Sequence, residues 1–292
     1  MQHFPIGSKG RDLILRMLSY EDVRVLVEDD LEYFLENREA LKREKFPEGP
    51  LSDIVEIIIT RSYWSKRPLE TIIDRLREKD YPKLRDDELI VGYGDLDLII
   101  EVAGELSSEA DNDFWRSFWE GRRNSLRAFK NAISKAGSLK KWVDEIYECV
   151  RSRGSWKSHE YFEGIKGIGS KGINLLLRDM GYFDRVPIDI HERRFLLRTG
   201  IALYYGPSSR DPASSEFYSE ALTRFCEENL KSVKIKGIPL DKSPGIVDLI
   251  VWHFACEREV ESCKKVCSSR PRCNICPVRD LCLYGSLTKP TC

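Results

Sequence analysis

Apolar residues recur along most of the chain at intervals of three or four positions, which predicts amphipathic helices. The segments with this spacing are 13–18, 51–76, 115–135, 139–151, 195–204, 214–228 and 245–255. A polar elbow at 61–67, followed by Pro68, divides the second of them into a pair of helices. The run 96–102 fits a helix or a strand, and 205–212 is rich in turn residues. Because no segment alternates strictly between apolar and polar residues, we expect an all-α protein.

Composition sets broad limits on what the chain can be. Its 292 residues are 41% hydrophobic, enough for one large domain or two closely packed ones. No apolar run approaches the roughly 18 residues of a membrane span, and residues 1–9 lack the apolar centre of a signal peptide. We therefore expect a cytoplasmic protein with reduced cysteines and no membrane partner. The 33% charged residues and the single glutamine, Gln2, favour a thermophilic source.

The net charge of −1 neither indicates nor excludes a nucleic-acid partner, since a basic surface can be local. A glycine-rich turn is more informative. Gly167-Ile168-Gly169 is followed by Ser170, Lys171 and an apolar helix. Two glycines one residue apart allow a tight turn between helices, with Ile168 anchored in the core. The N–H groups that begin the second helix then suit a phosphate oxygen, so Gly167, Gly169 and Ser170 are candidate DNA contacts. The alternative is a corner without a ligand.

Two residues near this turn have the chemistry of a nucleophile and its helper. A lysine such as Lys171 can act as a nucleophile once it has lost its proton. Asp189 follows eighteen positions later, in the segment Val186 to His191. A carboxylate can stabilise positive charge on a reacting sugar or assist proton transfer. Taken alone, Lys171 would be a solvated helix residue and Asp189 a helix N-cap after Pro187, and Asp189 can serve both purposes.

Five of the nine cysteines lie between residues 263 and 282, which favours a metal site over disulfides. Four of them, with the spacing C-x5-C-x2-C-x5-C, are Cys267, Cys273, Cys276 and Cys282. Four thiolates at this density can hold a [4Fe–4S] cluster or Zn²⁺, and spacing alone does not choose between them. Cys263 is an alternative first ligand, at C-x9-C. The other cysteines, 149, 226, 256 and 292, are expected to be core or tail thiols.

Taken together, these motifs resemble the endonuclease III branch of the helix–hairpin–helix DNA glycosylase superfamily. That branch has a hairpin of the type Leu-Pro-Gly-Val-Gly-Arg-Lys and an acid within Val-Asp-Thr-His, and segments 165–171 and 188–191 stand in those places. Its cysteine loop has the pattern C-x6-C-x2-C-x5-C, which residues 273–282 match closely. The likeness extends over roughly residues 48–285.

The chain departs from this pattern in four places. Lys166 replaces the hairpin proline, and the first cysteine interval is one residue short. The interval between His253 and the first cluster cysteine is longer than in the family. The glutamine expected in the elbow is missing, because the elbow reads Thr60-Arg61-Ser62-Tyr63-Trp64. Arg61, Ser62 or Tyr63 could fill the space left by a flipped base, or the aromatic residues could belong to the core.

The resemblance implies a particular architecture. We expect two helical lobes with a DNA groove between them: a six-helix barrel at 46–184 that ends in the hairpin, and a second lobe built from 1–45 and 185–292. The cysteine loop, 263–285, would hold a structural [4Fe–4S] cluster and present Arg270 and Arg272 to DNA phosphates. The partner would be double-stranded DNA, bound by a monomer at the nucleoid.

The resemblance also implies base-excision repair. Lys171 would displace a damaged or mismatched base through a Schiff base, assisted by Asp189, and the strand would then break by β-elimination. Oxidised pyrimidines are the usual substrate of this branch, while mismatched uracil or thymine and oxidised guanine remain open. In one alternative Asp189 activates water and the enzyme is a glycosylase without lyase activity. In others the chain is a non-catalytic, cluster-bearing DNA-binding protein, or a redox protein that leaves the hairpin without a role.

Overall fold

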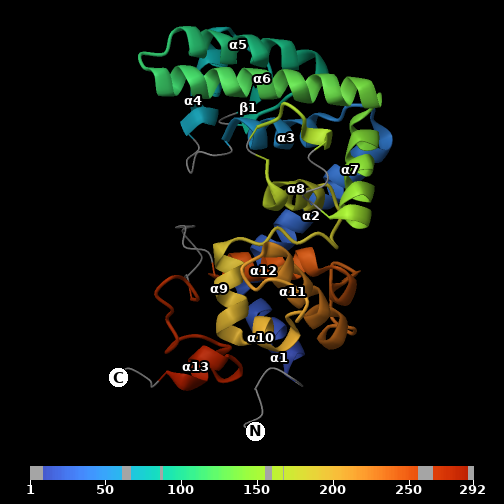
Figure 1. Ribbon diagram of the computed structural model, residues 1–292, viewed down its shortest axis with the longest axis vertical. Coiled ribbons are helices and arrows are strands. Elements are labelled where there is room, and N and C mark those ends of the chain that lie inside the picture. Colours follow the sequence, from blue (N-terminus) through green and yellow to red (C-terminus); the bar gives the residue numbers. More distant parts are fainter. Residues whose placement is uncertain are drawn as a thin grey trace. The chain divides into compact units, whose positions relative to one another are not determined.

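The computed structural model describes residues 9–60, 67–85, 88–154, 160–166, 168–255 and 266–288. In these ranges the chain is mostly helical, as the spacing of apolar residues predicts (Figure 1). Two antiparallel ladders of two-residue strands are the exceptions. They are too short to produce an alternating pattern that a sequence analysis could detect. Within the described ranges, no helix combines the length and apolar character that a membrane crossing requires.

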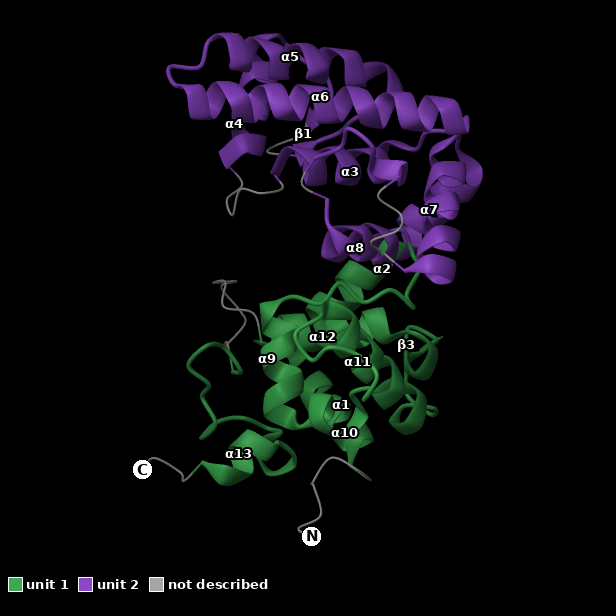
Figure 2. Ribbon diagram, in the orientation of Figure 1, with its two compact units in different colours: residues 1–34, 181–292 green, residues 35–180 purple. Residues whose placement is uncertain are grey.

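The chain divides into two compact units (Figure 2). Unit 1 comprises residues 1–34 and 181–292, and unit 2 comprises residues 35–180. The first division falls inside helix α2, Glu21–Arg43, and the second falls directly after helix α8. The lobes predicted from the sequence divide instead after residues 45 and 184. Lys171 therefore belongs to unit 2, whereas Asp189 and the cysteine loop belong to unit 1.

The described part of unit 2 contains six α-helices, together with the end of α2. They are α3 (Glu48–Thr60), α4 (Arg67–Glu78), α5 (Leu96–Ser108), α6 (Asp113–Ala136), α7 (Leu139–Arg153) and α8 (Ser170–Asp179). The ambiguous run at 96–102 is thus helical. Helices α5 and α6 lie side by side (Figure 1). Their apolar faces are buried at residues such as Val102, Leu126 and Phe129, which are fully shielded from solvent. Burial of each such side chain stabilises the fold by about 1.5–3 kcal/mol.

Short-range signals set the ends of α6 and α7. The side chain of Asn112 accepts the N–H of Trp115 at the start of α6, and Ser138 accepts the N–H of Lys141 at the start of α7. Helix α6 ends at Gly137, whose φ of +88° is a left-handed conformation that favours glycine. Gly121 lies within α6 and does not interrupt it.

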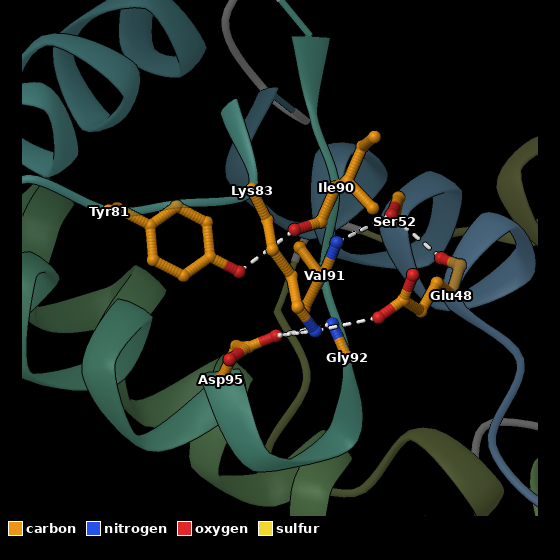
Figure 3. Close-up of polar contacts among 8 residues, drawn as sticks. All are labelled: Glu48, Ser52, Tyr81, Lys83, Ile90, Val91, Gly92 and Asp95. Atoms are coloured by element: carbon orange, nitrogen blue, oxygen red, sulfur yellow. Dashed lines mark hydrogen bonds and ion pairs between the residues drawn. The ribbon is translucent and has the colours of Figure 1, made fainter. Parts of the chain in front are cut away.

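A polar network joins α3 to the segment that leads into α5 (Figure 3). Lys83 Nζ lies 2.6 Å from Glu48 Oε1 and 3.0 Å from Asp95 Oδ2. The same Asp95 oxygen accepts the N–H of Gly92 at 2.8 Å, three residues earlier in the chain. Partial burial opposes ionisation of Asp95, but its hydrogen bonds with Lys83 and with the Gly92 N–H hold its pKa below the usual value.

Unit 1 packs around helix α12, Pro244–Ala255, of which every residue except Trp252 is buried. Helices α1 (Gly10–Leu18), α9 (Ile190–Thr199) and α11 (Ser215–Asn229) contact it. Helices α10 (Ile201–Tyr205) and α13 (Leu283–Leu287) pack against α9. A helix that is apolar on all sides belongs in a core. Truncating one of its large side chains, such as Phe254, to alanine is expected to cost about 3–5 kcal/mol.

Two details of unit 1 differ from the sequence analysis. The single helix expected over 195–204 is broken at Gly200, whose φ is +88°, so α9 and α10 are separate. A hairpin follows α11, with β3 (Lys234–Ile235) paired to β4 (Ile238–Pro239). Lys236 and Gly237 turn this hairpin with φ values of +46° and +82°. Positive φ at both central residues matches the right-handed twist of a two-residue hairpin.

Candidate active site and cysteine loop

The glycine turn leads directly into α8, in unit 2. Gly169 is the N-cap of this helix, in an extended conformation and without a capping side chain in the described part of the chain. A Cβ added at Gly169 would meet nothing within 4 Å. Ile168 is 3% exposed, which confirms that it anchors the turn in the core. The start of α8 therefore combines a space free of side chains with helical N–H groups, the features that bind a phosphate.

Lys166, which stands where the family pattern has proline, has its own structural purpose. Its backbone N–H donates to Ser125 Oγ at 3.0 Å, and Ser125 in turn donates to the carbonyl of Gly121 at 2.8 Å. Ser125 is fully buried on α6. Proline has no N–H and could not make this bond. The departure from the pattern is thus matched by a hydrogen bond that holds the entrance of the turn against α6.

Lys171 is the second residue of α8 and its side chain is exposed. A single 3-10 turn at 160–162 is separated from α8 by residues 163–169. Because the aliphatic stem of a lysine is flexible, an exposed position in the first helical turn lets its amine reach a bound molecule.

Asp189 is the N-cap of α9, in unit 1. Its Oδ1 accepts the N–H of His191 at 2.6 Å, and its side chain also accepts the N–H of Glu192. Glu192 reaches back, and its Oε2 accepts the N–H of Asp189 at 2.8 Å. This reciprocal arrangement is a capping box. The positive end of the helix and the donated N–H groups favour a carboxylate at Asp189, while Glu192 fixes the backbone that carries it.

Glu192 is itself an unusual residue, because it is a carboxylic acid that is only 1% exposed. Asp248, on α12, is also 1% exposed and acts on it electrostatically. Burial raises the pKa of Glu192 well above its ordinary value, and the charges of Asp248 and Asp189 raise it further. Glu192 therefore holds a proton under conditions in which an exposed glutamate has lost it.

The four candidate cluster ligands all face one pocket in unit 1. Cys267 and Cys282 are buried, and Cys273 and Cys276 are partly exposed. The pocket is completed by residues of α9 and of the loop itself, among them Phe195, Arg198, Val278 and Tyr284. In the described ranges, no three His, Cys, Asp or Glu side chains form a ready-made metal-binding group. The four sulfurs thus line one pocket, but they are not arranged as a group of metal ligands.

The pKa values of the pocket thiols are raised, chiefly by burial. Burial, together with the nearby Cys267, Cys282 and Cys273, raises the pKa of Cys276 to about 12. Burial likewise raises the pKa values of Cys267 and Cys282. Ionised together, these sulfurs would repel one another, so a bound cation would stabilise all of them. The N–H of Gly285 donates to Cys282 Sγ at 3.4 Å, a contact that also favours a thiolate.

Arg198 of α9 holds the loop that carries the first of these cysteines. Its guanidinium donates to the carbonyls of Cys267 at 3.2 Å, Ser268 at 2.6 Å and Ser269 at 3.1 Å, and lies 3.6 Å from Cys267 Sγ. The loop is also tied to the connection between α1 and α2, where Tyr20 donates to the carbonyl of Ile275 at 3.0 Å. These bonds fix the backbone on either side of the pocket.

The other residues that the sequence analysis singled out are either exposed, buried or outside the described residues. Arg270 and Arg272 are both exposed on the cysteine loop, where a phosphate could reach them. Gly167, Cys263 and the elbow residues 61–64 lie outside the described residues. Cys149 and Cys226 are buried, which confirms the expectation that they are core thiols. Their two unpatterned counterparts, Cys256 and Cys292, also lie outside the described ranges.

One helix of this fold begins at a glycine and another begins at a carboxylate, an arrangement that is compatible with a DNA-processing enzyme. Comparisons with known proteins give further information about its class. The chain is 32% identical over 115 residues to the 8-oxoguanine DNA glycosylase/AP lyase of Saccharolobus solfataricus. It is 34% identical over 97 residues to the protein of the same name from Saccharolobus islandicus strain Y.N.15.51. These matches cover 39% and 33% of this chain.

The chain spans 46% and 41% of the lengths of these two relatives, so the similarity is distant and partial. No profile of a known family matches the chain, and no solved structure matches it. The similarity is to archaeal proteins whose names include both glycosylase and lyase. The endonuclease III branch and its iron–sulfur cluster remain predictions.

Sequence reasoning missed several residues that shape these sites. Ser125 and Asp248 lie far along the chain from the residues they influence, and no local motif marks them. Arg198 is missed for the same reason, since its bonds reach some seventy positions along the chain to residues 267–269. Glu192 could have been found, because an acid followed three residues later by a glutamate at a helix start is a capping-box signal.

Proposed function

We propose that this protein is a base-excision DNA glycosylase with AP lyase activity, and that 8-oxoguanine is the first substrate to test. The observation that carries the proposal is the exposed Lys171 in the first turn of α8, behind an N-cap with an open Cβ position, in a chain with partial similarity to 8-oxoguanine DNA glycosylase/AP lyases. Lyase activity needs an amine nucleophile, and lysine is the side chain that provides one.

In this proposal the start of α8 binds the DNA backbone. The backbone N–H groups in the first turn of α8 would donate to a phosphate oxygen, with the Ser170 hydroxyl beside them. Such contacts position the duplex without reading its sequence. The damaged nucleotide must leave the stack before its sugar can react, so the bound DNA would be distorted.

The chemistry then follows from two side chains. The neutral amine of Lys171 attacks C1′ of the extruded nucleotide, and the damaged base leaves. The resulting imine acidifies the sugar, so the strand breaks by β-elimination. The carboxylate of Asp189 stabilises positive charge that develops on the sugar and can accept or return a proton. Its capping hydrogen bonds hold it in one orientation and so reduce the reorganisation needed during the reaction.

We also propose that Cys267, Cys273, Cys276 and Cys282 hold a [4Fe–4S] cluster. The support is their shared pocket, their mutual effect on thiol pKa values and the N–H donated to Cys282. When bound, such a cluster would crosslink the loop and so stabilise the surface that carries Arg270 and Arg272. Anaerobically purified protein is expected to be brown and to contain about four iron and four sulfide per chain, as a [4Fe–4S] cluster requires. Colourless protein with one zinc would contradict the cluster and favour a Zn²⁺ site.

The enzymatic proposal is tested with duplexes that each contain one lesion: 8-oxoguanine, thymine glycol, uracil, or thymine opposite guanine. Base release and strand cleavage are measured separately under single-turnover conditions. The proposal expects both products from the 8-oxoguanine duplex. Base release without strand cleavage would indicate a glycosylase that uses water with Asp189. If no duplex is processed but all are bound, the chain is a DNA-binding protein without this activity.

A further inference from the structure

Asp189 is held by a buried acid, Glu192, whose role is inferred here on the basis of the proposed function, in which Asp189 takes part in catalysis. Glu192 lies at the third position of α9 and accepts the N–H of Asp189 at 2.8 Å. It is 1% exposed, so water does not solvate its carboxyl group. A buried acid of this kind either carries a cation partner or keeps its proton.

The surroundings of Glu192 favour the proton. Among the described residues, the charged groups that act on it most strongly are Asp248, on the packed helix α12, and Asp189 at the start of its own helix. Both are acids, and each disfavours a negative charge on Glu192. A hydrogen bond between the carboxyl groups of Glu192 and Asp189 adds to this effect. A proton shared by neighbouring acids resides on the one that is most desolvated.

We propose that Glu192 is a positioning residue for the reaction: as a neutral carboxylic acid it holds the backbone and the carboxylate of Asp189, so that Asp189 is the ionised member of the group. Two functions follow from this arrangement. One oxygen of Glu192 accepts the N–H of Asp189, and the protonated oxygen is available to donate to a neighbouring carboxylate. If Glu192 loses its proton, it repels Asp189 and weakens the cap that orients it.

The arrangement predicts a dependence of rate on pH that a purely structural residue would not produce. As pH rises through the elevated pKa of Glu192, its ionisation should reduce the rate of base release. Asp248→Asn removes a negative charge that faces Glu192, so the fall in rate should begin at a lower pH in that variant.

The experiment measures single-turnover base release from pH 5 to pH 10 for the full-length protein. Glu192→Ala should lower the rate by about tenfold or more at all pH values, because it frees the Asp189 backbone and displaces the carboxylate. Glu192→Gln has the shape and the donor of a neutral acid. It should recover most of that loss and lack the fall in rate at high pH. Asp95→Asn, which alters the corresponding acid three residues after Gly92 in unit 2, should keep the wild-type profile.

Infrared spectroscopy at pH 7 provides a readout that does not depend on activity. The carbonyl band of a protonated carboxyl group should be present in the wild type and weaker in Glu192→Gln. If that band is unchanged, or if Glu192→Gln retains the wild-type fall in rate at high pH, the inference is wrong. If no lesion is processed, the proposed function fails, and the infrared comparison still decides whether Glu192 is neutral. If Asp189→Asn remains active, Asp189 has no catalytic role and the inference about Glu192 is wrong, whereas the proposed glycosylase activity still stands.

Discussion

Asp95 in unit 2 and Glu192 in unit 1 each accept a backbone hydrogen bond at a helix start, but their pKa values are shifted in opposite directions. Each lies three residues after a helix N-cap, and each accepts the N–H of that residue at 2.8 Å. The pKa of Asp95 is lowered, because hydrogen bonds with Lys83 and the Gly92 N–H outweigh partial burial (Figure 3). The pKa of Glu192 is raised by burial and by Asp248 and Asp189. The comparison teaches that local sequence specifies the backbone hydrogen bond, whereas distant residues decide the protonation state.

The largest effect is expected for Asp189→Asn. Asparagine caps helices about as well as aspartate, so the thermal stability should remain close to that of the wild type. The carboxylate charge is lost, and base release should slow by about 10²- to 10⁴-fold. Single-turnover kinetics and thermal unfolding of the same preparation separate the two effects. A large loss of stability with a retained specific rate would mean that Asp189 is only a cap.

The second prediction concerns Gly169→Asp, which would give α8 an acidic N-cap like that of α9. In Gly169→Asp, the new side chain has room, since its Cβ would meet nothing within 4 Å, and it would cap the helix with a negative charge. The fold should be as stable as before, but DNA affinity should fall by about tenfold or more, because a charged phosphate contact is lost. Fluorescence anisotropy with a labelled duplex measures this effect. Gly121→Asp, on α6, is the matched control with an equally open Cβ position. Equal affinity in wild type and Gly169→Asp would exclude a phosphate at this helix start.

The third prediction uses stability rather than activity. Glu192 has a folded pKa above its ordinary value of 4.5, so it contributes stability that is present below pH 4.5 and is lost as pH rises towards the folded pKa. Glu192→Gln removes this loss, and its stability relative to the wild type should increase from pH 5 to pH 8. Asp95 has a folded pKa below 3.8, so it contributes stability above pH 3.8 that is lost on acidification. Asp95→Asn should therefore be less stable than the wild type at pH 7, and the difference should shrink below about pH 4.

Urea unfolding at each pH measures these differences in free energy of unfolding. The two variants are each other's control, because both replace an acid by an amide at the same position of a capping motif. The same pH trend in both would contradict the assignment of opposite charge states.

The smallest effect is expected for Lys83→Met. Lys83 contacts Glu48 and Asp95, but its side chain is 39% exposed, so solvent screens both ion pairs. The free energy of unfolding should stay close to that of the wild type, because exposed ion pairs contribute little. The pKa of Asp95 should rise towards its ordinary value, which NMR titration of its carboxyl group can detect. A loss of several kcal/mol would show that the network in Figure 3 is a stronger determinant of unit 2 than its exposure suggests.

Much of the fold could be predicted from sequence because its signals are local. The spacing of apolar residues predicted α6 and α12 almost to their ends, and it placed α7 within two residues of its observed end. The break at Gly200 was missed because apolar residues continue on both sides of it, and only the left-handed φ of this glycine ends α9. The two-residue ladders were missed because their pairing involves too few residues to form a pattern.

The candidate site was predictable only in part, for a physical reason. Lys171, Asp189 and the four pocket cysteines stand in motifs with fixed spacing, which a sequence displays directly. The buried Asp248 and the Lys166 contact with Ser125 arise from packing between elements distant in the chain. No spacing rule encodes such contacts, because they depend on how helices pack after they form.

The most direct test of the account is borohydride trapping on a duplex that contains 8-oxoguanine. Borohydride reduces a Schiff base to a stable amine, so an enzyme that attacks C1′ through a lysine becomes permanently linked to its DNA. The account predicts a protein–DNA adduct in the wild type and in Lys141→Ala, an exposed lysine on α7, and none in Lys171→Ala. Peptide mapping should place the link on Lys171. An undiminished adduct in Lys171→Ala, or base release by the wild type without any adduct, would contradict Lys171 as the nucleophile.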